Sequence, residues 1–130
     1  AFVLRHRAFA AHGNIGNGAA ADAVLSVHLN YYSSPSRRGA QAFYKGGDEN
    51  GGRFADYIQK NLNGLSGQPR PLSALTGDYY VLNESEPPAA LAECGFLSNE
   101  EDEKLLLTYA YKEEIARRLA AGIYEFLYSV

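Results

Sequence analysis

The stretch that decides the fold is an apolar run in the second half of the chain, Pro87-Pro88-Ala89-Ala90-Leu91-Ala92-Glu93-Cys94-Gly95-Phe96-Leu97. An apolar run of this length that follows two prolines is typical of a buried strand, since proline suits the position before a strand and not its middle. We therefore predict a strand over Ala89–Leu97. A single carboxylate, Glu93, interrupts it.

A second strand is predicted upstream, over Val24–Asn30. Its apolar side chains fall on one face and its polar side chains, Ser26, His28 and Asn30, fall on the other. Two further short strands are predicted over Ala40–Lys45 and Tyr79–Asn83.

Helices are predicted between and after these strands. One covers Arg53–Leu62, where apolar residues recur at every fourth position, and another covers about Tyr111–Tyr128. Ser98 followed by Glu101 has the spacing of a capping box, which predicts a helix running through residues 105–107. Asn63–Asp78 is predicted to be a long loop, and loops of this length within a compact domain are often functional.

Strands that alternate with helices favour an α/β fold. We expect three layers, with a mostly parallel or mixed sheet flanked by helices, in a single domain over residues 1–130. The order of the strands stays open.

Composition excludes several classes of protein. The net charge of −3 argues against a nucleic-acid-binding protein, and the sequence contains no apolar run long enough to cross a membrane. One cysteine cannot form a disulfide within the chain or a four-cysteine zinc site. No signal segment opens the sequence, which begins with Ala1.

Glu93 is the first candidate for chemistry. A carboxylate inside an apolar strand is costly to bury unless it is paired, bound to a metal or protonated. Burial would raise its pKa, which suits a general base or acid near neutral pH. The alternative is an ion pair with an arginine such as Arg5 or Arg70.

His28 is the second candidate, near the carboxyl end of its strand, where ligands bind in α/β sheets. A neutral imidazole there suits a metal ligand or a proton carrier, and the alternative is a strand histidine that is satisfied by its neighbours. His6 and His12 lack the spacing of paired ligands on a helix and are expected at the surface. Asn30, Arg38 and Arg70 are candidates for substrate binding, because arginines in loops hold carboxylates well.

Cys94 lies next to Glu93, but alternation along the strand places it on the opposite face. We expect it to be buried, and to be neither a metal ligand nor a nucleophile.

Three blocks of the sequence resemble zinc-dependent N-acetylmuramoyl-L-alanine amidases. Residues 21–30 (Ala-Asp-Ala-Val-Leu-Ser-Val-His-Leu-Asn) resemble the family block "AD…ISIHAN", and residues 39–44 resemble the strand that follows it. Residues 88–99 (Pro-Ala-Ala-Leu-Ala-Glu-Cys-Gly-Phe-Leu-Ser-Asn) resemble the block "PavLvEcGFlSN". The sequence of residues 34–41 is similar to that of the spore-cortex type of these enzymes.

This resemblance implies a hydrolase of the bacterial cell envelope, extracellular or periplasmic, that cuts the amide bond between N-acetylmuramic acid and L-alanine in peptidoglycan. It implies one zinc ion, with His28 as a ligand and Glu93 as the general base. It does not identify any activator or regulatory protein. Two further zinc ligands of the family, a histidine in an N-terminal block and a glutamate, have no counterpart in this sequence. The resemblance therefore implies the C-terminal part of an amidase catalytic domain, without its N-terminal part.

Two other interpretations stay open. The chain could be a catalytically silent module of the same fold that binds or regulates the cell wall, since a catalytic zinc usually needs three protein ligands. It could also be an unrelated α/β protein in which Glu93 forms a structural ion pair.

Overall fold

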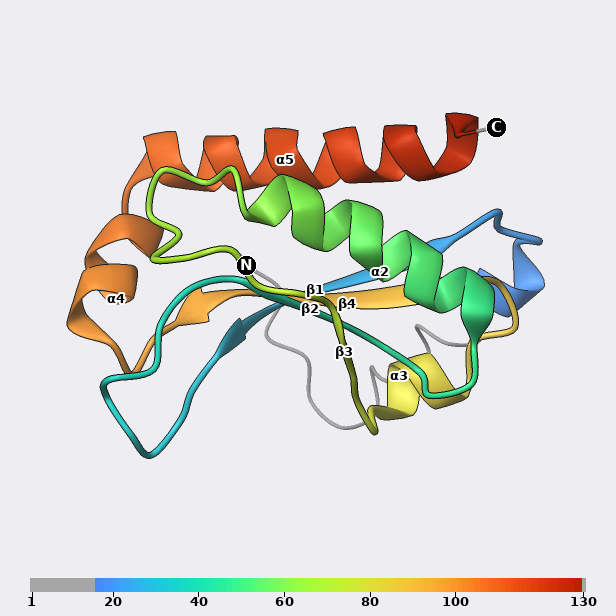
Figure 1. Cartoon of the computed structure of the whole chain (residues 1–130), viewed down its shortest axis with the longest axis horizontal. Coiled ribbons are helices and arrows are strands. Elements are labelled where there is room, and N and C mark those ends of the chain that lie inside the picture. The colour runs from blue at the N-terminus through green and yellow to red at the C-terminus, as the bar shows by residue number, and fades with distance from the viewer. Residues whose placement is uncertain (1–15, 130) are drawn as a thin grey trace.

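A computed structural model describes residues 16–129 of the chain. Arg5, His6 and His12 lie outside the described residues. The helices and strands follow one another along the chain (Figure 1) in the order β1 (Val24–Asn30), β2 (Gln41–Tyr44), α2 (Glu49–Leu62), β3 (Leu75–Thr76), α3 (Tyr80–Asn83), β4 (Ala89–Phe96), α4 (Glu100–Leu106) and α5 (Tyr109–Tyr128).

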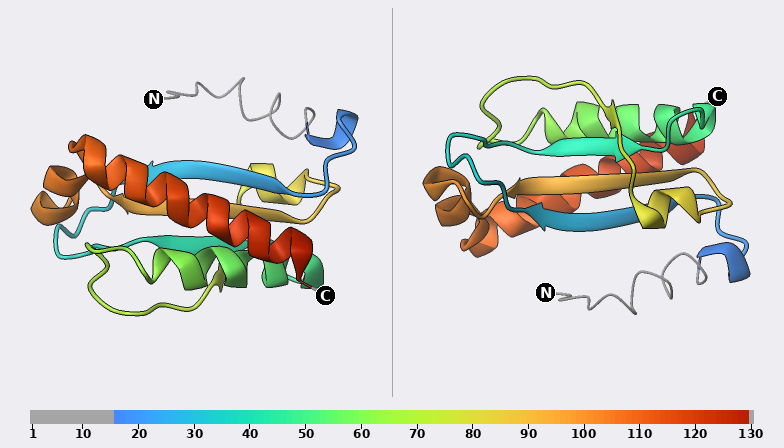
Figure 2. Two further views of the ribbon diagram at one scale, coloured as in Figure 1. Left: turned by 90° about the horizontal axis from the view of Figure 1, so that it is seen from above. Right: turned by 90° about the horizontal axis from the view of Figure 1, so that it is seen from below.

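The strands form one mixed sheet in the order β1-β4-β2-β3. β4 lies inside the sheet, parallel to β1 and antiparallel to β2, and the short β3 is parallel to β2. Figure 2 shows β4 between β1 and β2, with α5 crossing diagonally above them. All eight residues of β4 are buried, as the apolar run predicts. The expectation of a mixed sheet flanked by helices is confirmed.

One face of the sheet is covered by α2 and α5. The predicted stripe of α2, Phe54, Ile58 and Leu62, is completely buried in the core between these helices and the small side chains of Ala90 and Ala92. The helices approach closely at Gly122 of α5, where an added Cβ would lie 3.1 Å from the Cα of Ile58. The opposite face carries a smaller core in which α3 contributes Val81 and Leu82.

The prediction of a strand over residues 79–83 is wrong, because residues 80–83 form helix α3. Its aromatic and β-branched composition favours a strand. However, the consecutive residues Val81 and Leu82 are both buried against the same face of the sheet. A strand would turn one of them away, whereas a helical turn allows both to pack.

Other predicted boundaries shift by up to one helical turn. α2 begins at Glu49 rather than Arg53, because the Asp48 carboxylate caps it by accepting from the Gly51 amide at 2.9 Å. α4 is capped by Asn99 rather than Ser98: Asn99 Oδ1 accepts from the amides of Glu101 and Asp102. α5 begins at Tyr109, and the loop 63–78 contains β3.

A β-bulge interrupts the pairing of β1 with β4. His28 is the partner of Glu93 and Asn30 is the partner of Phe96, so one residue on β1, Leu29, lies opposite two on β4, Cys94 and Gly95. The extra residue accompanies Gly95, whose φ of 148° favours glycine. The bulge brings Phe96 onto the face that Glu93, His28 and Asn30 share.

No helix among residues 16–129 is long and apolar enough to cross a membrane.

Candidate active site

His28 and Glu93 are direct partners on the neighbouring parallel strands β1 and β4. Partners in a parallel pair project from the same face of the sheet. Both residues lie toward the carboxyl ends of their strands, on the face opposite α2 and α5. The arrangement is the one expected from their sequence patterns, and it places an imidazole beside a carboxylate.

The Glu93 carboxylate is buried, with 8% of the residue exposed. Its Oε2 atom has no hydrogen-bond partner among the described residues, and neither Arg70 nor any other described cation forms an ion pair with it. Burial raises the pKa of Glu93 to about 7. Because a buried polar atom without a partner is costly, the site has the character of one built for a reaction rather than for stability.

Aromatic side chains lie on the same side of the sheet as Glu93. Tyr79 lies on the same side, where it packs edge-to-face against Phe43 with ring centroids 5.3 Å apart. Burial and, to a lesser extent, the Glu93 charge raise the pKa of the Tyr79 hydroxyl. Burial beside these rings disfavours the charged form of the carboxylate, which is the cause of its raised pKa.

The His28 ring is oriented by its own strand. Ser26 lies two residues earlier on the same face, and its Oγ is 2.7 Å from His28 Nε2. A partner of this kind holds an imidazole in one orientation.

A catalytic zinc takes three protein ligands and one water. Among residues 16–129 there is no group of three His, Cys, Asp or Glu side chains that could hold a metal ion. The described residues alone therefore do not fit a zinc site.

Cys94 lies on the other face of β4, in the main core, and is 2% exposed. Burial, and secondarily the Glu93 charge, raise the pKa of its thiol to about 12. Its predicted burial is confirmed, and a thiol with such a pKa is a poor nucleophile.

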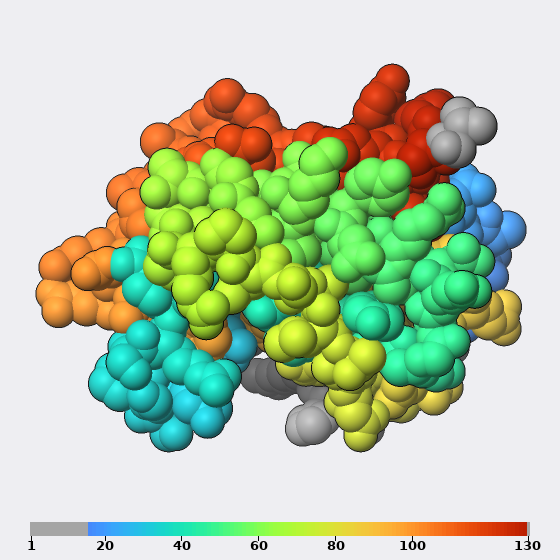
Figure 3. All heavy atoms as spheres, viewed as in Figure 1, coloured from blue at the N-terminus to red at the C-terminus, as the bar shows by residue number. Residues whose placement is uncertain are grey.

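A cavity of about 680 Å³ adjoins this site, and we call it the loop cavity. It is lined by residues from loop 31–39, from loop 63–74 and from the strand ends, and it includes all three predicted substrate-binding residues, Asn30, Arg38 and Arg70. Gln41 also lines it and is the partner of Glu93 across β2 and β4. Figure 3 shows the two loops as neighbouring lobes, cyan and yellow-green.

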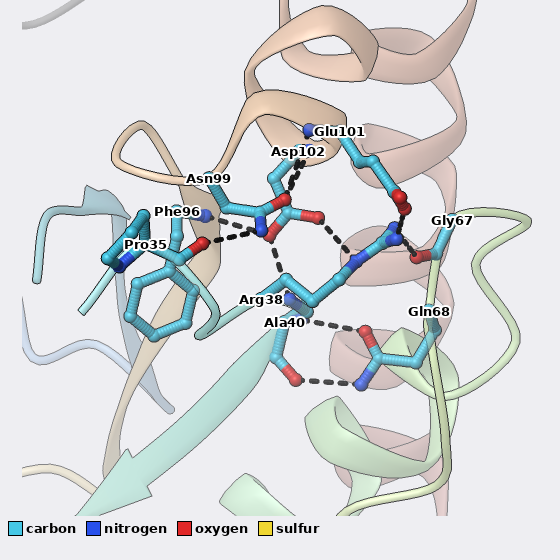
Figure 4. A network of polar contacts seen from close by, with 10 residues as sticks. Pro35, Arg38, Ala40, Gly67, Gln68, Phe96, Asn99, Glu101 and Asp102 are labelled. Atoms are coloured by element: carbon cyan, nitrogen blue, oxygen red, sulfur yellow. Dashed lines mark hydrogen bonds and ion pairs between the residues drawn. The ribbon is translucent and has the colours of Figure 1, made fainter.

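A buried carboxylate that sequence analysis missed, Asp102, holds one wall of the cavity (Figure 4). Its Oδ2 accepts from the amides of Gly39 at 2.8 Å and Phe96 at 3.0 Å. Its Oδ1 lies 3.3 Å from Nε of Arg38, which also pairs with Glu101 and donates to the Gly67 carbonyl. Asp102 thus ties both loops to β4, as a positioning residue.

The chain is similar to known proteins of one family. The family profile described as N-acetylmuramoyl-L-alanine amidase matches residues 5–125. The germination-specific N-acetylmuramoyl-L-alanine amidase of Bacillus subtilis is 34% identical over 111 residues, which cover 85% of this chain and 46% of that protein. The amidase LytC of the same species is 32% identical over 111 residues, which cover 84% of this chain and 22% of LytC.

The structure of the CwlD amidase from Clostridioides difficile in complex with the GerS lipoprotein has the same fold. Its TM-score is 0.86 at 29% identity, over 95% of this chain and 66% of that chain. This chain spans less than half the length of the two curated relatives. The germination-specific relative agrees with the resemblance of residues 34–41 to spore-cortex enzymes. By its sequence blocks, its mixed sheet and these matches, the chain belongs to the N-acetylmuramoyl-L-alanine amidase family.

Proposed function

We propose that this chain forms the C-terminal part of the catalytic domain of a cell-envelope enzyme that hydrolyses the amide bond between N-acetylmuramic acid and L-alanine in peptidoglycan. The observation that carries the proposal is the pairing of His28 with Glu93, whose buried Oε2 has no hydrogen-bond partner among the described residues. The family membership and the loop cavity beside this pair support it.

Glu93 is the general base in this proposal. With a pKa of about 7 its carboxylate takes a proton from a water molecule as the water oxygen attacks the amide carbonyl carbon. The same carboxyl group then gives the proton to the amide nitrogen as the carbon–nitrogen bond breaks. The products are a carboxylate on the lactyl group and a free amine on L-alanine.

His28 is the proposed ligand of the one zinc ion that the family resemblance implies. The remaining ligands would come from outside residues 16–129, and Ser26 would orient the imidazole. Asn30, Arg38 and Arg70 belong to the proposed substrate site, since all three line the loop cavity. The CwlD amidase structure is a complex with the GerS lipoprotein. By analogy, the proposal includes an activator or regulatory protein that binds this enzyme.

The test is Glu93→Gln in the whole protein that carries this segment, with Glu86→Gln as the matched control on an exposed glutamate. Release of stem peptide from purified peptidoglycan is measured. We expect Glu93→Gln to lower the rate by about 10²- to 10⁴-fold with the fold intact, and Glu86→Gln to leave it unchanged. Full activity in Glu93→Gln contradicts the assignment.

A second candidate function is a catalytically silent module that binds or regulates the cell wall. It is favoured by the lack of a three-ligand metal group among the described residues. Binding of peptidoglycan by the whole wild-type protein, without zinc and without release of stem peptide, would establish this alternative.

A further inference from the structure

The loop cavity has an unusual balance of charge. Three arginines, Arg37, Arg38 and Arg70, line it, and none of the aspartates and glutamates among residues 16–129 does. The whole chain carries a net charge of −3, so the cationic lining is a local feature. A pocket with several guanidinium groups and no lining carboxylate is complementary to an anion.

The three arginines differ in their own partners. Arg38 is compensated by Asp102 and Glu101. Arg37 stacks over the Tyr32 ring, with its guanidinium carbon 4.6 Å from the ring centroid, and has no ion pair within residues 16–129. Arg70 likewise forms no ion pair with any described carboxylate. Of the described lining residues, Arg37 and Arg70 are thus the two cations available to a ligand.

The backbone that carries Arg70 is fixed on both sides. Gln68 exchanges two hydrogen bonds with the backbone of Ala40, at 2.7 Å and 2.9 Å. The Asn63 side chain exchanges two with the backbone of Leu72, at 2.8 Å and 3.0 Å. Gln41 donates to the Ser73 carbonyl at 2.7 Å. A guanidinium on such a fixed segment binds with a smaller loss of entropy than one on a free loop.

The cavity begins beside the reaction centre. Gln41 is the strand partner of Glu93, and Asn30 follows His28 by two residues on the same face. A substrate with its scissile amide at Glu93 therefore extends into the cavity with the groups that lie next along its chain. In peptidoglycan the N-acetylated sugars are neutral, whereas the stem peptide carries carboxylates. The apolar lining residues Phe43, Leu72 and Leu75 suit the aliphatic part of that peptide.

We propose, on the basis of the proposed amidase function, that the loop cavity binds the stem peptide and that Arg37 and Arg70 bind a free carboxylate on the residue after L-alanine. These two arginines then determine specificity, and an amidated stem peptide is the poorer ligand. Arg38 holds the wall of the cavity through Asp102.

The test measures binding to the chain without any hydrolysis. The probes are N-acetyl-L-Ala-γ-D-Glu-L-Lys-amide and the same peptide with the free carboxylate of its D-Glu residue converted to an amide. Binding is followed by chemical shift changes at low salt. We expect the acidic peptide to bind about tenfold more tightly, because a charge-assisted pair with guanidinium is lost in the amide.

The variants Arg37→Gln and Arg70→Gln are each expected to lower the affinity for the acidic peptide about fivefold to tenfold and to leave the amidated peptide unchanged. Arg117→Gln is the matched control, since Arg117 is exposed on α5 and pairs with Glu113. Equal affinity for the two peptides, no effect of either variant, or no binding of either peptide overturns the inference.

These outcomes are separate from those of the proposed function. Hydrolysis that survives Glu93→Gln overturns the role of Glu93 and leaves a measured preference for the acidic peptide standing. Equal binding of the two peptides overturns the role of Arg37 and Arg70 and leaves the amidase reaction standing.

Discussion

Replacing Asp102 is expected to cause a large, specific loss of stability. The residue is 3% exposed and its Oδ2 atom satisfies two amides, those of Gly39 and Phe96. Asp102→Ala leaves both amides without a partner, at about 1 to 3 kcal/mol each, and leaves Arg38 with the exposed Glu101 as its one described ion-pair partner. We expect a total loss of about 3 to 5 kcal/mol.

Asp102→Asn separates the two contributions. The Asn amide oxygen can take the place of Oδ2 and accept from both amides, while its NH₂ group replaces Oδ1 and faces the Arg38 donor. The ion pair is lost and two donors then face each other, but both backbone amides stay paired, so we expect a smaller loss of about 1 to 2 kcal/mol. Glu103→Ala, an exposed residue on the same helix, is the control and is expected to change stability by less than about 0.5 kcal/mol.

The assay is urea denaturation followed by circular dichroism, at pH 7 and fixed salt. The order of stability expected is wild type, Asp102→Asn, Asp102→Ala, with equal slopes against urea. Two results would refute the reasoning: Asp102→Ala within about 1 kcal/mol of wild type, or Asp102→Asn as unstable as Asp102→Ala.

Three further predictions concern the site. Because burial raises the pKa of Glu93 from 4.5 to about 7 in the folded state, the stability of the wild type should fall as pH rises from about 4.5 to 7. This fall is at most about 3 kcal/mol, and less where water screens the carboxylate, and Glu93→Gln should remove it. Identical pH profiles of stability for the wild type and Glu93→Gln in urea melts would contradict this prediction. The 130-residue chain should retain far less than one zinc after dialysis and show little amidase activity, and stoichiometric zinc by elemental analysis would contradict this. Cys94 should react with a thiol reagent only as the chain unfolds, and rapid labelling of the folded chain would count against its burial.

The sheet and the His28–Glu93 pair were predictable because they depend on local pattern. The alternation of apolar and polar residues predicts β1, and the continuous apolar run predicts β4. Because ligands bind at the carboxyl ends of strands in α/β sheets, His28 and Glu93 are expected to lie together there. The sequence blocks added the family. The register that makes them direct partners follows from the pairing of β1 with β4, which no local pattern specifies.

Asp102 could not be predicted because its role depends on contacts distant in sequence. It is one of four acidic residues in the first turn of α4, and its neighbours Glu100, Glu101 and Glu103 are exposed. Acidic residues are common at this end of a helix, so composition alone does not distinguish it. Its amide partner Gly39 lies 63 residues away.

Helix α3 and the bulge at Gly95 were not predicted, because both depend on contacts with other strands of the sheet. The composition of residues 79–83 favours a strand, but packing against β4 selects a helical turn. A glycine in a strand suggests a bulge only once the partner strand is known. The bulge matters for the site, because it turns Phe96 into the loop cavity.

The most direct test of the central claim is to identify the bond that the whole protein cuts. Purified peptidoglycan is digested, new amino termini are labelled and new reducing sugar ends are counted. The account predicts that L-alanine appears as the new amino terminus, that no reducing ends form, and that Glu93→Gln abolishes the signal. New reducing ends, or a new amino terminus other than L-alanine, would contradict it.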